Sequence, residues 1–382
     1  MLDPDYLEGA GWTVGKIYRA IEHSMITLLA SKLPGLDFTD RTVMIAVYLL
    51  ARSSTQELTK LIDAHKDEIS AEVTREIERA VKHSDAVDRR IIERGLGRAI
   101  PSLAESAPDI IKSATVGIGL ILERENIAMV ESAKQAFIQA TAEALTEVNA
   151  GLITPDKAKK RAVRILAKDG IGIISYKNTE TGRVTVRNQA DVAVRRHIRS
   201  QMHQATLRLT EERLAQAEWD LVEVSSHTGS RPSHAAWQGR IYSLSGTHPR
   251  YRDFYEATGY QGRKGSNAAL GDRLGGVNCR HSFAPYIEGM KRTYEPDPQH
   301  PSGKSNEEIY KLTQAQRRRE RDIRAAKRER DAAIAAGLPE EDVKALAQSV
   351  RVEQRKMREL VSENSSVLQR QPRREWAGDR PR

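Results

Sequence analysis

Four side chains in the middle of the chain could together bind a metal ion. His227 and His234 flank the sharp turn Gly229–Pro232, and Cys279 and His281 share one side of the chain if they lie on a strand. One cysteine and three histidines are ligand types that suit tetrahedral zinc. Alternatively, these histidines are structural and hydrogen-bond backbone groups of neighbouring loops. The structural hypothesis is preferred, so no cofactor is expected, and zinc at this set stays a candidate.

A nucleophilic thiol is the second chemistry that this region could carry. The groups that such a mechanism would use are Cys279 as the thiolate, His234 or His281 as its base, and Asn278 or Asp253 to orient the base. Arg280 could lower the pKa of the thiol, yet a small buried thiol beside a turn needs no catalytic role. We therefore predict no catalytic residue and no enzyme activity.

Other conspicuous side chains of this region are expected to hold loops and a small core together. Arg231 and Arg280 are expected to be ion-paired loop anchors, because a guanidinium can bridge a carboxylate and backbone carbonyls. Trp237, Phe254 and Tyr255 are expected in the core, since only 5% of the chain is aromatic and a small domain needs apolar bulk.

Three blocks of sequence carry these residues in a fixed order. They are H-x-G-x-R-P-x-H-x-x-W-Q-G from residue 227, Y-x-D-F-Y from residue 251 and N-C-R-H from residue 278. This combination resembles the phage minor capsid protein 2 family, which is related to the phage Mu F-type head proteins. The resemblance extends by pattern over residues 1 to about 295 and leaves the helices after residue 300 outside. The residues that match the family motif are His227, Arg231, Pro232, His234, Trp237, Gln238, Gly239, Asp253, Phe254, Tyr255, Asn278, Cys279, Arg280 and His281.

The resemblance implies a structural minor capsid protein of a tailed-phage head. Such a protein is expected at the portal vertex during head morphogenesis, with the phage portal protein, other head proteins and packaged double-stranded DNA, bound non-specifically, as partners. It is expected in the virion, near the portal, after assembly in the host cytoplasm. The alternatives are a nucleic-acid-binding protein ejected with the phage genome and a metal- or Cys-dependent enzyme.

The chain is basic, and most of the excess charge lies near its C-terminus. Its 382 residues carry a net charge of +9, which favours an acidic partner such as nucleic acid. From residue 301 onward 20 Lys and Arg stand against 14 Asp and Glu, so +6 of that charge lies there. Alternatively, the mixed signs at helical spacing form a solvated helix with i, i+4 ion pairs. The candidates for contact with DNA phosphates are Arg317, Arg318, Arg319, Arg321, Arg324, Lys327, Arg328, Arg373 and Arg374.

Apolar spacing and turn residues predict an α+β fold whose helices and strands position these groups. The expected elements are helices over 56–91, about 118–148, 155–168, 189–219, 306–336 and 340–364, a hairpin over 171–186, a strand over 221–224, and short strands and shaped loops over 225–300. A polar, glycine-containing turn at 178–182 is expected to close the hairpin, and the tail from Gln371 is expected to be disordered.

The expected domains are three consecutive ranges. A long N-terminal helical region over 1–150 docks on the portal or a neighbouring subunit, a central small α+β domain over 151–300 forms the minor capsid core, and 301–382 is a basic C-terminal helical extension. The longest apolar run, Val43–Ala51, is far shorter than the roughly 20 residues that span a bilayer, so no membrane partner is expected. The first ten residues also lack the cationic start and apolar middle of a signal peptide.

Overall fold

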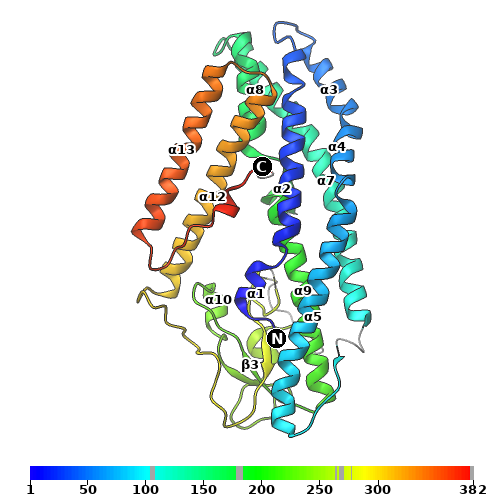
Figure 1. Ribbon diagram of the computed structural model, residues 1–382, viewed down its shortest axis with the longest axis vertical. Helices are drawn as coiled ribbons and strands as arrows, with labels where there is room; N and C mark the ends of the chain where they lie inside the picture. The colour runs from blue at the N-terminus through cyan, green and yellow to red at the C-terminus, as the bar shows by residue number, and fades with distance from the viewer. Residues whose placement is uncertain (104–107, 178–183, 263–264, 266–270, 277, 379–382) are drawn as a thin grey trace. The chain divides into compact units, whose positions relative to one another are not determined.

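The computed structural model describes residues 1–103, 108–177, 184–262, 265, 271–276 and 278–378 (Figure 1). Most of these residues are helical, and the strands among them form two small sheets. The predicted α+β class is therefore confirmed. None of the helices in the described part of the chain combines the length and apolar composition that a membrane crossing requires.

The helices and strands have the following bounds. The α-helices are α1 (Pro4–Gly9), α2 (Trp12–Ala30), α3 (Val43–Ser53), α4 (Thr55–Asp63), α5 (Lys66–Leu96), α7 (Pro108–Asn149), α8 (Pro155–Asp169), α9 (Ala190–Gln216), α10 (Pro232–Ala235), α11 (Phe254–Thr258), α12 (Asn306–Ala335) and α13 (Glu340–Glu363). The 3-10 turns are η1 (Leu33–Gly35) and η2 (Pro372–Glu375). The strands are β1 (Gly172–Lys177), β2 (Val184–Gln189), β3 (Leu221–Val224), β4 (Ile241–Ser243) and β5 (Phe283–Pro285).

The chain divides into two compact units, each built from three separate stretches. Unit 1 comprises Met1–Trp12, Ser70–Ile121 and Arg195–Thr313, and unit 2 comprises Thr13–Ile69, Leu122–Val194 and Gln314–Arg382. The compact units thus follow a different division from the consecutive ranges 1–150, 151–300 and 301–382. Those ranges stay a prediction about how functions are distributed along the chain.

Unit 1 contains a three-stranded antiparallel sheet with the order β4-β3-β5. Val222 in the central strand lies opposite Tyr242 of β4 and Pro285 of β5. All four residues of β3 are buried, and the one charged residue among them, Glu223, accepts the backbone N–H groups of Thr293 and Tyr294. The core on this sheet consists of Ile92, Leu207, Leu214, Val222, Val224, Trp237, Tyr242, Phe254, Tyr255, Tyr260, Leu274, Cys279 and Phe283.

Buried polar contacts connect α5 to α9 within unit 1. Arg213 of α9 forms an ion pair with Asp85 of α5, and the hydroxyl of Thr210 donates to Asp88. Burial alone would raise the pKa of Asp85, but hydrogen bonds from Arg213 and Ser102 outweigh it and hold that pKa below its ordinary value. These contacts satisfy carboxylates that would otherwise be costly to bury.

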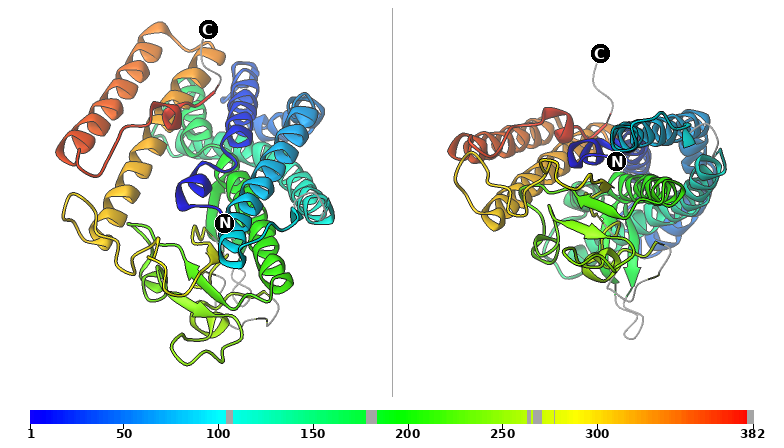
Figure 2. Two further views of the ribbon diagram at one scale, coloured as in Figure 1. Left: turned by 60° about the horizontal axis from the view of Figure 1, so that its bottom comes forward. Right: turned by 90° about the horizontal axis from the view of Figure 1, so that it is seen from below.

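Unit 2 is largely a set of long helices joined by polar contacts. The hydroxyl of Tyr18 in α2 donates to Asn126 of α7 at 2.6 Å. Lys160 of α8 pairs with Asp342 of α13. Most of α12 lies beside α13, as the views in Figures 1 and 2 agree, and Arg319 reaches Glu353 across the two helices at 4.0 Å.

A buried ion cluster lies inside unit 2, formed by Arg19, Glu22, Asp191, Arg324 and Arg328. Arg19 pairs with Asp191, its Nε lying 3.1 Å from Oδ2. The Arg328 guanidinium donates to the carbonyls of Ala167 and Lys168, at 3.0 and 3.1 Å. Burial raises the pKa of Glu22, although the nearby Arg328 opposes that shift. Arg328 is only 1% exposed, so this arginine of the C-terminal helix belongs to the interior.

Two sequence predictions about helices and tail are wrong. The single helix expected over 56–91 is two helices, α4 and α5, separated by Ala64 and His65, where the N–H of His65 bonds to the carbonyl of Ile62. That short turn contains neither glycine nor proline, so the apolar spacing gives no sign of it. The expected disorder from Gln371 is contradicted over 371–378, because η2 forms there and buried Glu375 pairs with Arg370.

The hairpin expected over 171–186 is confirmed for its two strands. β1 and β2 pair antiparallel in unit 2, with Ile173 opposite Asn188. The turn expected at 178–182 and the last residues of the tail, 379–382, lie outside the described residues.

Candidate functional site

The motif blocks come together in unit 1 at the edge of the three-stranded sheet. Pro232 is the first residue of α10, where a missing N–H costs nothing. Asp253 caps α11, its Oδ1 accepting the N–H of Glu256 at 2.9 Å. The last block runs directly into β5, so short elements position each functional side chain.

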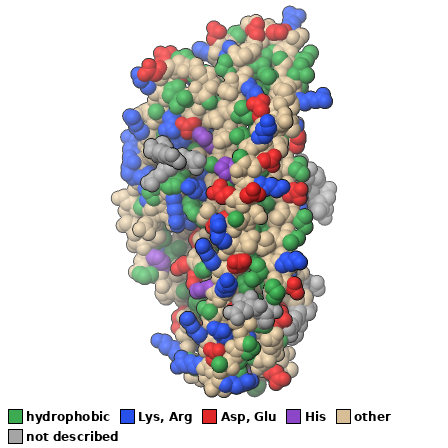
Figure 3. Space-filling model, turned by 45° about the vertical axis from the view of Figure 1, so that its right-hand side comes forward, with side chains coloured by type: hydrophobic (Ala, Val, Ile, Leu, Met, Phe, Trp, Pro, Cys, Tyr) green, Lys and Arg blue, Asp and Glu red, His purple; other side chains and the backbone are tan. Residues whose placement is uncertain are grey.

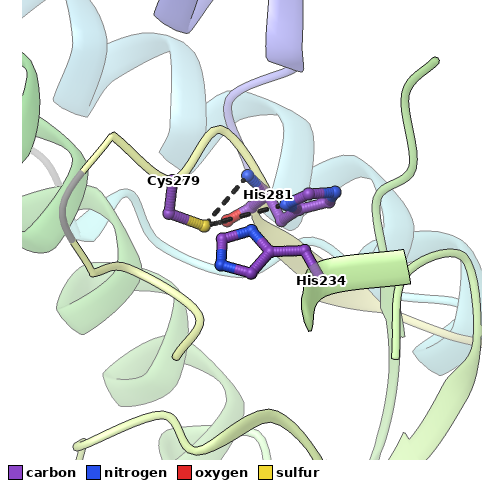
Figure 4. Close-up of side chains that lie close together, drawn as sticks. All are labelled: His234, Cys279 and His281. Atoms are coloured by element: carbon purple, nitrogen blue, oxygen red, sulfur yellow. Dashed lines mark hydrogen bonds between the residues drawn. The ribbon is translucent and has the colours of Figure 1, made fainter. Parts of the chain in front are cut away.

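Three of the motif side chains form a buried group that we call the Cys/His cluster: His234, Cys279 and His281. One potential ligand atom from each lies within 4.8 Å of the others, and all three residues are buried. Figure 4 shows the ring of His234 beside the sulfur of Cys279 and the ring of His281. The Sγ of Cys279 lies 3.7 Å from Nδ1 of His281. The cluster thus joins α10 to the segment that precedes β5.

Gln238 fixes the protonation of His281. Its Oε1 accepts the backbone N–H of His227 at 3.3 Å and lies 2.9 Å from Nε2 of His281. An amide oxygen is only an acceptor, so Nε2 of His281 must carry the proton. The lone pair of the neutral ring is therefore on Nδ1, the atom that faces the sulfur of Cys279.

The same reasoning applies to His234. Its Nε2 lies 3.1 Å from the carbonyl oxygen of Gly271, which can only accept a hydrogen bond. Arg231 donates to that same carbonyl and so helps to hold the loop. Nε2 of His234 is therefore protonated, and Nδ1 carries the lone pair. Both histidines of the cluster are neutral bases oriented by a protein oxygen.

Burial controls the acid–base properties of the cluster. It lowers the pKa of His234 to about 4 and the pKa of His281 well below its ordinary value. It also raises the pKa of the Cys279 thiol, although backbone N–H groups and two arginines oppose that shift. Near neutral pH the rings are therefore uncharged and the isolated thiol is protonated.

His227 lies next to the cluster without joining it. Its ring stacks on that of His281, with centroids 4.5 Å apart and planes 23° apart. Its Nδ1 lies 3.0 Å from the carbonyl of Thr228 and 3.3 Å from the guanidinium of Arg280. The structure thus brings together three of the four candidate ligands, and the set of four stays a prediction.

Two backbone positions give the motif residues Asn278 and Gly239 a conformational role that the sequence did not predict. Asn278 has a φ of 58°, in the left-handed region that asparagine tolerates better than most residues. Gly239 has a φ of 61°, and a Cβ there would collide with the backbone of Glu295. The N-C-R-H and W-Q-G blocks therefore encode backbone shape as well as side-chain chemistry.

The arrangement does not activate Cys279 as a nucleophile. A reactive thiol needs a lowered pKa and access to substrate, whereas burial raises this pKa and the side chain is 2% exposed. Arg280 pairs with Glu8 at 3.3 Å, so its charge is already compensated. Trp237, Phe254 and Tyr255 lie in the core, as expected.

Several residues of the site carry no signal in the three blocks. His203 of α9 reaches Ser282 through Nε2 at 3.2 Å, and burial lowers its pKa to about 4. Glu8 of α1 is the counter-ion of Arg280. Asn306, the first residue of α12, holds the loop at Gly229 and Ser230 through its side-chain amide. Each lies far away in the sequence, so only the folded chain reveals it.

The candidate DNA contacts fall into two groups. Arg324, Lys327 and Arg328 donate to backbone carbonyls of unit 2, and two of them, Arg324 and Arg328, are buried. The candidates on the surface or half-buried are Arg317, Arg318, Arg319, Arg321, Arg373 and Arg374. Figure 3 shows acidic and basic side chains interspersed over one face of the molecule.

Comparison with known proteins gives one match. The sequence model of a protein family described as phage minor capsid protein 2 matches residues 2–362. The match includes α12 and α13, so the prediction that the helices after residue 300 lie outside the resemblance is wrong. No curated protein and no solved structure matches the chain.

Proposed function

Because the chain belongs to the phage minor capsid protein 2 family, we propose that it is a structural protein of the portal vertex that contacts packaged DNA during head morphogenesis. Membership of a capsid family makes the chain a virion protein whose partners include other phage head proteins. The proposal adds the portal, the DNA and a non-enzymatic role. Its main support is the match over residues 2–362.

The described contacts favour a structural role for the motif region. The three motif blocks bury neutral histidines, cap a short helix and fix tight backbone turns. Such contacts hold loops in one shape, which a subunit that binds neighbours through its surface requires. The thiol has neither the pKa nor the access of a catalytic nucleophile.

Composition of purified heads tests the portal proposal. Heads assembled with and without the portal protein are purified, and the chain is quantified by mass spectrometry against the major capsid protein. We expect the chain in portal-containing heads, whether or not they hold DNA, and its loss from heads that lack the portal. Equal amounts in both kinds of head, or absence from both, would overturn the proposal.

The exposed arginines of α12 favour a second candidate, a nucleic-acid-binding protein ejected with the genome. Arg318 and Arg321 are exposed on α12, and Arg373 is exposed on η2, which follows α13. Quantifying the chain in heads before and after triggered genome release separates the candidates. Retention supports the structural proposal, whereas loss with the DNA supports the ejected protein.

A charge-matched pair of variants tests the DNA contact itself. Replacing Arg318, Arg321 and Arg373 together by alanine removes three exposed charges, and replacing Arg351, Arg355 and Arg358 removes three from α13. We expect the first variant to lose about 0.9 from the slope of log affinity against log salt for each phosphate contact removed, and the second to keep that slope. Equal losses in both variants would show that only net charge matters.

A further inference from the structure

We propose that His234, Cys279 and His281 bind one zinc ion through the two Nδ1 atoms and the thiolate sulfur. The three side chains bring one soft sulfur and two imidazoles together, a donor set that suits zinc among the metals common in proteins. The inference concerns this cluster alone and does not depend on the proposed place of the protein in the head.

The separation of the donor atoms fits a shared metal ion. Typical zinc–sulfur and zinc–nitrogen bonds of about 2.3 and 2.1 Å at a tetrahedral angle place sulfur and nitrogen about 3.6 Å apart. The Sγ of Cys279 and Nδ1 of His281 are 3.7 Å apart. His234 completes a group whose ligand atoms lie within 4.8 Å of one another, so small side-chain rotations close the site.

The hydrogen bonds around the cluster have the pattern that supports metal-binding histidines. Such histidines donate their second N–H to a protein oxygen, which fixes the tautomer and the ring orientation. Nε2 of His281 donates to Gln238, and Nε2 of His234 donates to the carbonyl of Gly271. Both Nδ1 lone pairs are thereby free to coordinate, and a purely structural pair of histidines would not require this common orientation.

The surroundings also suit a thiolate. The N–H of His281 approaches the sulfur at 3.4 Å, and Arg231 and Arg280 act electrostatically on it. On binding, the thiol releases its proton to solvent and the sulfur lone pair forms the zinc–sulfur bond, so no oxidant or reductant is needed. With three protein ligands, one tetrahedral position is left for a water molecule.

Zinc at this point would join α10 to the segment before β5. His234 lies on α10, whereas Cys279 and His281 follow the left-handed residue Asn278. The ion would hold the loop at Gly271 and the strand β5 in register with α10. Because all three ligands are buried, we expect the ion to act on the stability of this part of unit 1.

Metal analysis of the purified full-length chain tests the proposal. The protein is incubated with zinc, separated from free metal by gel filtration and analysed by mass spectrometry for bound zinc. We expect about one zinc per chain, and cobalt in its place should give the absorption of a thiolate-to-cobalt transition. Cys279→Ser, His234→Ala and His281→Ala should each lose the bound metal.

Two histidine variants serve as controls. His227→Gln changes the ring that stacks on His281 without removing a proposed ligand, and His300→Ala changes a histidine of a loop elsewhere in unit 1. Both should retain about one zinc. Loss of zinc in His227→Gln would overturn the assignment of three ligands.

A measurement on the unaltered protein tests the proposal even if the variants fail to fold. Zinc should slow the reaction of Cys279 with a thiol reagent in mild denaturant, and a chelator should restore the faster reaction. The proposal would be overturned if the unaltered protein bound no more zinc than the Cys279→Ser protein. It would also be overturned if zinc did not change the rate at which the thiol reacts.

Discussion

The Cys/His cluster of unit 1 and the buried ion cluster of unit 2 bury ionisable groups in opposite ways. Around Cys279 the histidine rings are neutral, and Nδ1 of His281 lies 3.7 Å from the sulfur of Cys279. Around Arg328 the guanidinium groups pair with a carboxylate, as Arg19 does with Asp191, or donate to backbone carbonyls, as Arg328 does. The zinc ion that we propose for the first arrangement would add a cation from outside, whereas the second already contains its own cations.

This difference shows that buried polarity has two uses in one chain. Neutral buried bases retain an electron pair for a ligand, at the cost of titrating far from their ordinary pKa. Buried ion pairs use up their charge inside the protein, so they specify packing and contribute nothing to an outside partner. Four changes would break or sharpen the contrast.

The largest effect is expected for Arg328→Met. The change leaves two carbonyls and the Glu22 carboxylate without their buried cation, so we expect the free energy of unfolding to fall by about 3–5 kcal/mol. Urea unfolding followed by circular dichroism measures it. Arg321→Met, on an exposed position of the same helix, should change stability by less than about 0.5 kcal/mol. Similar losses in both variants would contradict the burial argument.

Gln238→Leu should have the next largest effect. It removes the acceptor of the His227 N–H and of Nε2 of His281, and unsatisfied buried donors cost about 1–3 kcal/mol. Urea unfolding of zinc-free protein is the measurement. Gln238→Glu keeps an acceptor and should recover part of the loss; if it proves no better than leucine, Gln238 is merely filling space.

Acid should destabilise the folded chain through buried histidines such as His203, which lies beside the Cys/His cluster. The pKa of His203 is about 4 in the folded chain and about 6.5 when unfolded, so the unfolded chain binds more protons as the pH falls below 6.5. Stability is therefore lost as the pH falls from 6.5 toward 4, by about 1 kcal/mol per such histidine between pH 6.5 and 5.5. His203→Gln, compared with the wild type in the presence of a chelator, should show a shallower pH dependence; an unchanged slope would contradict it.

The smallest effect is expected for Arg319→Ala. Arg319 is only partly buried and lies 4.0 Å from Glu353 and 3.6 Å from Asp322. Exposed pairs of this kind contribute about 0–1 kcal/mol, so thermal unfolding should shift little and less at high salt. A loss as large as that of Arg328→Met would mean that the two helices depend on this pair.

The sequence predicts local elements well where one pattern decides them. The apolar run at 221–224 is β3, and the break at Gly337 to Pro339 separates α12 from α13 as expected. The sequence predicts that Cys279 and His281 share one side if they lie on a strand; they do lie close together, but in the irregular segment before β5. Local patterns fail where the turn residues carry no signal, as with Ala64 and His65 between α4 and α5.

Arg328 and His203 illustrate what cannot be predicted. Both lie on helices rich in charge, where periodicity does not tell which polar face turns inward. Arg328 is buried because carbonyls at the end of α8 accept its hydrogen bonds. His203 joins the site because Ser282 lies opposite it, 79 residues later in the chain. The local sequence around a residue does not indicate contacts of this kind, because the partner lies far away in the chain.

The left-handed backbone at Gly239 and Asn278 limits which sequences this fold accepts. A Cβ at position 239 would strike the backbone of Glu295, so a library randomised there should return glycine alone. Position 278 is exposed, so only its left-handed backbone conformation limits which residue it accepts. A library randomised there should return asparagine, glycine and aspartate. Two motif residues from different blocks, which look equally strict in the sequence, therefore differ in how freely evolution can change them.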